Sequence, residues 1–332
     1  MSSTASPPAT PTPAPHAPLA PGAYAADLAA IRAAAERIAP HLQRTPVLHS
    51  RNLDDLAGRH LFFKCEPFQR GGSFKIRGAL NAVLRLDPAT AARGVLTHSS
   101  GNFAQALAIA AGLRGIPAWV VMPEDAPRVK VAAVRAAGAT IVFCPSRQRA
   151  ATAAQVQAET GAAYLPSYDH PDVIAGQATC AVELLEEVPG LDAIVAPVGG
   201  GGLLGGTALA CHTLSPATAV FGAEPVAADD AARSKAAGHV LPPGDPTTIA
   251  DGLRTGLGTW TWPLVRDLVT AIQTVPEDEI VAAMRLLWER LKVVTEPSGA
   301  IALAAALHLP PEHQRVGLIL SGGNVDLDAL PF

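Results

Sequence analysis

The stretch DAIVAPVGGGGLLGGTALACHTL, residues 192–214, joins three patterns in immediate succession. Residues 192–197 are a short apolar run typical of a buried strand, residues 199–202 are four glycines, and a helix-like segment follows. Glycines between a strand and a helix let several backbone N–H groups converge on a phosphate, and the helix N-terminus adds partial positive charge. A flexible linker is the alternative, but linkers lack such apolar flanks. The stretch therefore predicts a phosphate-binding loop.

The alternation of strand and helix extends through most of the chain. Strands are expected at residues 94–99, 117–122, 140–144, 192–197, 219–224 and 316–321. These segments are continuously apolar, as burial on both faces of a parallel sheet requires. Strands that alternate with helices form βαβ units, so the predicted fold class is α/β.

Composition excludes several classes of protein. The 332 residues are 49% hydrophobic and 16% charged, which favours a globular chain over a disordered one. A net charge of −4 without a Lys/Arg run makes nucleic acid an unexpected partner. The most apolar stretch, residues 191–211, contains Pro197 and six glycines, so no membrane span is expected.

The first 22 residues contain seven prolines and are expected to be a disordered tail outside the fold. They lack the basic and apolar regions of a secretory signal, so a cytoplasmic location is expected. The four cysteines are far apart, which indicates reduced thiols and no metal-binding Cys pair.

Lys75 lies in the segment GGSFKIRGA, residues 71–79. An isolated lysine in the first turn of a helix is usually a surface charge. Here apolar neighbours and glycines would allow burial, and a desolvated lysine has a lowered pKa and becomes nucleophilic. A reactive lysine together with a phosphate loop is the minimum set of groups for binding pyridoxal phosphate.

These motifs, together with SSGN, AEP with ADD, ADGL, EPSGA and SGGNVDL, occur in the order seen in fold-type II pyridoxal-phosphate enzymes. The chain resembles serine racemases and serine/threonine dehydratases from about residue 24 to 326. The resemblance implies two open, mostly parallel sheets with helices on both faces, as in the tryptophan synthase β fold, and a homodimer. It also implies a large cofactor-binding domain, residues 23–93 and 169–332, and a small domain, residues 94–168.

The resemblance also implies roles for individual residues. Lys75 would form the Schiff base with the cofactor and act as catalytic acid and base. Phe74 would pack near the cofactor ring, Asn102 would bind its phenolic oxygen, and the run Gly199, Gly200, Gly201 and Gly202 would hold its phosphate. Ser321 would face the pyridine nitrogen, which a neutral hydroxyl leaves largely unprotonated.

A second group of residues would bind the substrate: Ser99, Ser100, Gly101, Asn102, Phe103 and Thr255. In serine racemases a serine at the position of Ser100 lies opposite the lysine, and two bases on opposite faces allow racemisation. The same serine could equally be a helix cap. The family usually has histidine where this chain has Phe103, and neither Arg147 nor Arg149 aligns clearly with a family arginine. These departures, with Thr255 in place of a serine, favour a bulkier or less polar β-substituent.

Glu224, the carbonyl of Ala228, and Asp230 match the family's divalent-cation ligands, and oxygen ligands suit Mg²⁺ or Ca²⁺. A solvated acidic cluster is the alternative.

The sequence thus predicts an ammonia-lyase that converts a β-hydroxy-α-amino acid into a 2-keto acid and ammonia. The expected substrate is like threonine or serine, or is a bulkier 3-hydroxy amino acid such as phenylserine or 3-hydroxyaspartate. An amino-acid racemase and a non-catalytic pyridoxal-phosphate-binding protein remain as alternatives.

Overall fold

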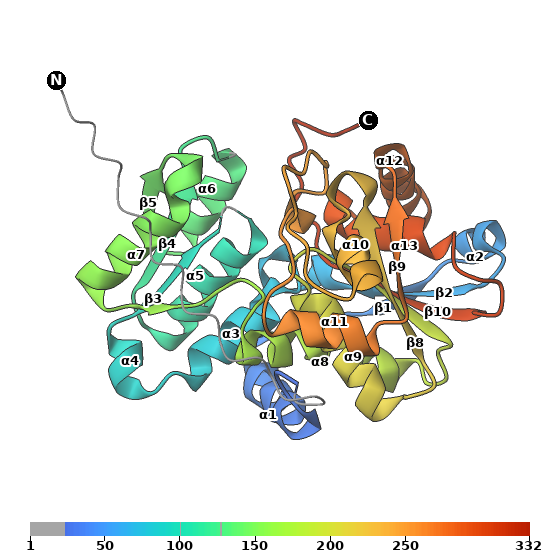
Figure 1. The fold of residues 1–332 in the computed structure, drawn as a ribbon, viewed down its shortest axis with the longest axis horizontal. Helices are drawn as coiled ribbons and strands as arrows, with labels where there is room; N and C mark the ends of the chain where they lie inside the picture. Colours follow the sequence, from blue (N-terminus) through green and yellow to red (C-terminus); the bar gives the residue numbers. More distant parts are fainter. Residues whose placement is uncertain (1–23, 100, 127) are drawn as a thin grey trace.

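The computed structural model describes residues 24–99, 101–126 and 128–332, so the proline-rich segment 1–22 and Ser100 lie outside the described residues. The strands form two sheets (Figure 1). The larger sheet contains, in spatial order, β1 (Val47–His49), β2 (His60–Cys65), β10 (Arg315–Leu320), β7 (Ala193–Pro197), β8 (Ala219–Pro225) and β9 (Ala271–Val275). The smaller sheet contains β5 (Thr140–Cys144), β4 (Ala118–Pro123), β3 (Val95–His98) and β6 (Ala163–Tyr164). Among the described strands, only β1 and β2 pair antiparallel, which confirms the predicted α/β class with two mostly parallel sheets.

Helices cover both sheets. They are α1 (Leu28–Ile38), α2 (Arg51–Ala57), α3 (Lys75–Arg85), α4 (Pro88–Ala92), α5 (Asn102–Arg114), α6 (Arg128–Ala136), α7 (Arg149–Thr160), α8 (Pro171–Glu187), α9 (Gly202–Leu214), α10 (Asp230–Ala237), α11 (Thr261–Leu268), α12 (Glu277–Leu286) and α13 (Pro297–Ala306). Short 3₁₀ turns and a π-helical turn, Leu287–Leu291, connect some of them.

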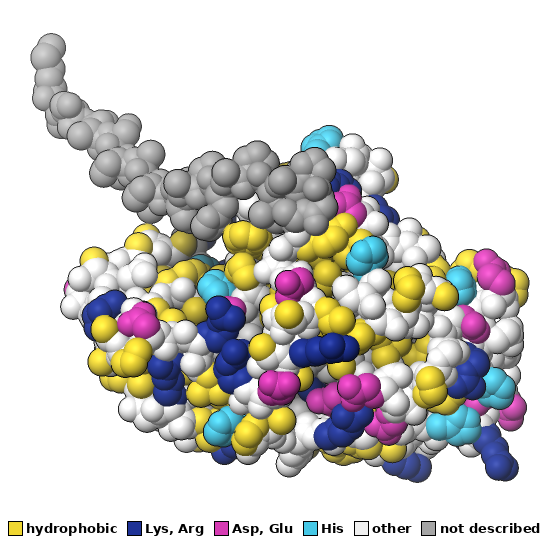
Figure 2. Space-filling view, turned by 90° about the horizontal axis from the view of Figure 1, so that it is seen from below, with side chains coloured by type: hydrophobic (Ala, Val, Ile, Leu, Met, Phe, Trp, Pro, Cys, Tyr) yellow, Lys and Arg dark blue, Asp and Glu magenta, His cyan; other side chains and the backbone are white. Residues whose placement is uncertain are grey.

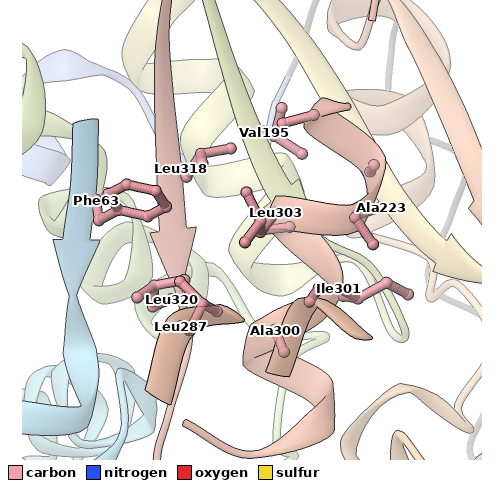
Figure 3. Close-up of a cluster of buried hydrophobic side chains, with 14 of the residues drawn as sticks. Phe63, Val195, Ala223, Leu287, Ala300, Ile301, Leu303, Leu318 and Leu320 are labelled. Carbon is pink, nitrogen blue, oxygen red and sulfur yellow. The ribbon is translucent and has the colours of Figure 1, made fainter. Parts of the chain in front are cut away.

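The large sheet is buried on both faces, as its continuous apolar strands predict. On one face Val195, Leu318 and Phe63 pack against α13, whose Leu303 and Ile301 point into the same cluster (Figure 3). On the other face the alternate strand residues pack against α8, α9 and α11. The period of two along each strand directs neighbouring side chains to opposite faces, so every residue of β7 is buried.

The small sheet has a similar arrangement. One face packs against α3, α5 and α6, and the other against α7. Helix α3 packs against both α5 and α8, and its apolar side chains belong to the same cluster as those of the small sheet, although residues 75–85 were expected to belong to the large domain. The predicted domain limits themselves stay a prediction.

All six expected strands are present, with ends that differ by at most one residue. Strands β1, β2, β6 and β9 were not expected. Strand β2 contains Lys64, which is fully buried and pairs with Glu183 at 2.6 Å, so its charge is neutralised by a residue distant in sequence.

In the part of the chain that the structure describes, no helix has the length and apolar character to cross a membrane. On the face shown in Figure 2, Lys and Arg side chains are interspersed with Asp and Glu.

Candidate active site

A cavity of about 600 Å³ opens where strands of both sheets end. His98 ends β3 and Ser99 follows it, Pro197 ends β7, and Ser321 follows β10, and all of them line this cavity. Loops at the carboxyl ends of parallel strands are where open α/β sheets bind ligands. The two sheets thus share one candidate site, formed from segments far apart in sequence.

The glycine run Gly199–Gly202 lines the cavity at the N-terminus of α9. Any larger residue would collide with the surrounding chain: a Cβ atom at Gly200 would overlap ring atoms of Tyr168, and one at Gly199 would lie 2.9 Å from Cα of Leu253. Gly201 has φ of +84°, a conformation that favours glycine. The loop therefore presents backbone rather than side chains at a helix N-terminus, which suits a phosphate.

Lys75 is the first residue of α3 and lies on the cavity wall. Its Nζ donates a hydrogen bond to the carbonyl oxygen of Ser167 at 3.1 Å and lies 4.9 Å from the centre of the Phe74 ring. Burial lowers the pKa of Lys75 to about 8, against the opposing charge of Glu296. A lysine with a lowered pKa beside a glycine cradle fits pyridoxal phosphate.

Asn102 begins α5 and is held between two residues to which the sequence analysis gave no role. Its Nδ2 donates to Glu296 at 2.7 Å, and its Oδ1 accepts from Asn324 at 2.9 Å. Glu296 is 5% exposed, and burial, with the charge of Asp251, raises its pKa to about 8. The motifs EPSGA and SGGN contain Glu296 and Asn324, but no local pattern indicates that both contact Asn102.

The other predicted site residues also lie at the cavity. Ser321 is buried and its hydroxyl donates to the carbonyl oxygen of Ser298 at 3.2 Å. Phe103 is buried among apolar side chains of the small sheet, and Thr255 is exposed at the cavity. Ser99, Gly101 and Asn102 complete the lining from this loop, whereas Ser100 lies outside the described residues.

Arg149, which the sequence analysis left undecided, also lines the cavity, whereas Arg147 does not. Arg149 is the first residue of α7, and its Nε donates to the carbonyl of Ser146 at 3.1 Å. The terminal guanidinium nitrogens have no partner among the described residues. Lys130, another cation of the cavity wall, pairs with Asp251.

The predicted cation ligands are close together at the end of β8 and in the chain that follows it. Glu224 lies at the end of this strand and accepts hydrogen bonds from the backbone N–H groups of Ala231 and Ala232, both at 2.8 Å. Asp230 is 1% exposed, and neither of its carboxylate oxygens has a partner among the described residues. Burial raises the pKa of Glu224 to about 8 and that of Asp230 to about 6. Buried carboxylates with orphaned oxygens fit a hard divalent cation.

Comparisons with known proteins agree with this geometry. The family model described as "Pyridoxal-phosphate dependent enzyme" matches residues 38–322. The chain is 54% identical to the β-hydroxyaspartate dehydratase of Paracoccus denitrificans (strain Pd 1222), over 90% of this chain and 96% of that protein. The solved maize serine racemase is 48% identical with a TM-score of 0.90, covering 92% and 95% of the two chains. A solved threonine deaminase, from T.th., is 48% identical with a TM-score of 0.86, covering 91% and 99%.

Proposed function

From the premise that the chain belongs to the pyridoxal-phosphate dependent enzymes, we propose that it removes water and ammonia from a β-hydroxy-α-amino acid that carries a second carboxylate, of the 3-hydroxyaspartate type. One observation carries the choice of substrate: Arg149 faces the same cavity as Lys75, with its terminal nitrogens unpaired among the described residues. The name of the Paracoccus relative, a β-hydroxyaspartate dehydratase, supports the same substrate class.

Different residues would bind the cofactor and the substrate. When bound, pyridoxal phosphate withdraws the electron pair that remains when the substrate loses its α-proton. Gly199–Gly202 would hold the phosphate, and the N-terminus of α5, at Gly101 and Asn102, would hold the α-carboxylate. A lysine amine whose pKa lies near neutrality can take up and release a proton at the substrate Cα, which is the role of Lys75.

The reaction balances without a further reagent. The α-proton and the β-hydroxyl group leave as water, and the carbon–carbon double bond forms in an unsaturated amine. After this amine becomes an imine, one water molecule hydrolyses it to a 2-keto acid and ammonia. The net reaction converts the hydroxy amino acid into a keto acid and ammonia.

Arg149 distinguishes between the bulkier substrates. A guanidinium binds a carboxylate through paired, charge-assisted hydrogen bonds. A phenyl substituent, as in phenylserine, would displace water from the same guanidinium without replacing those hydrogen bonds. A neutral methyl or hydrogen, as in threonine or serine, would leave it solvated. The side-chain carboxylate of 3-hydroxyaspartate is therefore the substituent that fits.

An amino-acid racemase is the second candidate. The likeness to the maize serine racemase favours it, and Ser100 is the residue that would supply the second base. Racemisation and elimination both begin with loss of the α-proton, so one preparation can be tested for both.

The proposal includes three further features. Glu224, the carbonyl of Ala228, and Asp230 would hold Mg²⁺ or Ca²⁺, which is supported by the orphaned oxygens of Asp230. We also propose that the enzyme is a homodimer and that it acts in the cytoplasm.

The test is a panel of L and D hydroxy amino acids, assayed for keto-acid release and, by chiral chromatography, for enantiomer interconversion. We expect kcat/KM for a 3-hydroxyaspartate isomer to exceed that for threonine, serine and phenylserine by at least about tenfold, and Lys75→Ala to abolish release. A higher kcat/KM for phenylserine or threonine would refute the proposal that the substrate carries a second carboxylate. Interconversion faster than keto-acid release would favour the racemase.

A further inference from the structure

We propose that His49, Asp54 and His60 form a binding site for a divalent transition-metal ion of the zinc type. The three side chains offer two imidazole nitrogens and one carboxylate oxygen, and these ligand atoms all lie within 4.8 Å of one another. None of the three lines the active-site cavity. They lie at the outer edge of the large sheet, at the end of the molecule where Figure 1 shows α2, away from the small sheet.

Local folding brings the three residues together. His49 ends β1, Asp54 lies in α2, and His60 begins β2, so the set spans only residues 49–60. Helix α2 ends at Ala57 and is capped by Gly58, whose φ of +64° turns the chain towards β2, which runs antiparallel to β1. All three ligands therefore come from one strand–helix–strand unit at the edge of the large sheet.

The distances agree with metal coordination. His49 Nε2 lies 2.9 Å, and His60 Nδ1 3.3 Å, from Oδ2 of Asp54. Two ligands bound at about 2.0–2.1 Å to a tetrahedral zinc ion lie about 3.3 Å apart. Small movements of two side chains would therefore complete a three-ligand set around one ion.

The orientation of Asp54 favours the site as well. Its Oδ1 accepts a hydrogen bond from the backbone N–H of Leu61 at 2.9 Å, which leaves Oδ2 directed at both imidazoles. The Asp54 side chain is only 11% exposed, whereas those of His49 and His60 are 46% and 64% exposed. The carboxylate is thus fixed by the fold, the rings can adjust, and a fourth position stays open to water.

The donor set decides the class of ion. Imidazole nitrogens with one carboxylate suit zinc, nickel or copper, whereas Mg²⁺ and Ca²⁺ prefer sites made of oxygen ligands alone. The site therefore differs in chemistry from the one proposed at Glu224 and Asp230. An ion bound here would link edge strand β1 to α2 and β2, and so would stabilise the fold rather than take part in the reaction.

The experiment is calorimetric titration of the untagged holoenzyme with zinc chloride, in excess Mg²⁺ so that the oxygen-ligand site is filled. We expect binding of one zinc ion that His49→Gln and His60→Gln each weaken by at least about tenfold, because the loss of even an outer-shell partner weakens metal binding by about 10–100-fold. Zinc should raise the Tm of the native chain and not that of the two variants. Asp54 is left intact because its substitution would also remove the hydrogen bond to Leu61.

His308→Gln is the matched control. His308 Nε2 lies 2.5 Å from a carboxylate oxygen of Glu279, so it forms a similar exposed His–carboxylate pair but with one imidazole. This variant should bind zinc as the native chain does. Absence of zinc binding by the native chain would overturn the proposal, as would unchanged binding by the His49 and His60 variants or equal weakening by all three variants.

Discussion

Replacement of Arg149 by alanine should remove the preference for a second carboxylate. Loss of one partner of a hydrogen-bonded charge pair costs about 2–5 kcal/mol when the pair is buried. Arg149 is only partly buried, so the lower part of this range applies. We expect kcat/KM for 3-hydroxyaspartate to fall about 30- to 300-fold, since about 1.4 kcal/mol corresponds to a factor of ten. The kcat/KM of Arg149→Lys should lie between that of the alanine variant and that of the native chain, because lysine keeps the charge but loses the planar pair of donors.

The assay is keto-acid release from 3-hydroxyaspartate and threonine by the same preparations. Threonine has no second carboxylate, so its kcat/KM should change only a few-fold. Arg147→Ala is the control variant, because Arg147 is exposed, lies two residues away and does not line the cavity. If both substrates lose activity equally in Arg149→Ala, or if Arg147→Ala gives the same loss, the reasoning is refuted.

Three other predictions concern the cofactor, the reactive lysine and the cation. Gly200→Ala should weaken pyridoxal-phosphate binding about five- to 150-fold, since overpacking costs about 1–3 kcal/mol. Gly112→Ala, whose new Cβ meets no atom closer than 3.9 Å, should bind pyridoxal phosphate as tightly as the native chain does in the same titration. If Gly200→Ala bound it as tightly as Gly112→Ala, the glycine run would not be the phosphate site. Because burial favours the neutral amine of Lys75, the apoenzyme should capture pyridoxal phosphate faster as pH rises, with a midpoint near pH 8. A midpoint near pH 10.5, the ordinary pKa of lysine, would show that burial does not lower the pKa of Lys75. Chelation of divalent cations should lower the Tm of the native chain, and added Mg²⁺ should restore it. The Tm of Asp230→Asn should not change on chelation. An unchanged Tm on chelation of the native chain would count against the cation site.

The sequence predicts those parts of the fold that depend on local composition. The strands that became β7 and β10 are continuously apolar because both sheet faces are covered, and this property is visible in the sequence itself. Strand β2 was missed because it contains a charged residue, Lys64, in its interior. Its charge is neutralised by Glu183, and its Nζ also donates a hydrogen bond to the carbonyl of Thr45, contacts that no local pattern reveals.

In the candidate site, too, some residues can be predicted from local sequence and others cannot. The glycine run and Lys75 lie in contiguous motifs, so their sequence neighbours indicate their chemistry. The hydrogen bond from Asn102 to Glu296 joins residues 194 positions apart, and only the tertiary structure brings them together. The choice between Arg147 and Arg149 depends on where a helix begins, and element ends are the least reliable part of a sequence-based prediction.

The strands of the small sheet all come from one continuous segment, residues 95–164. Lys75 and the glycine run lie outside this segment, whereas Arg149 lies within it. In evolutionary terms, the lysine and the glycines that would anchor the cofactor can therefore vary separately from the arginine that would select the substrate. Exchange of residues 146–149 between relatives would be a compact route to new selectivity, and the anchoring lysine and phosphate cradle would be inherited unchanged.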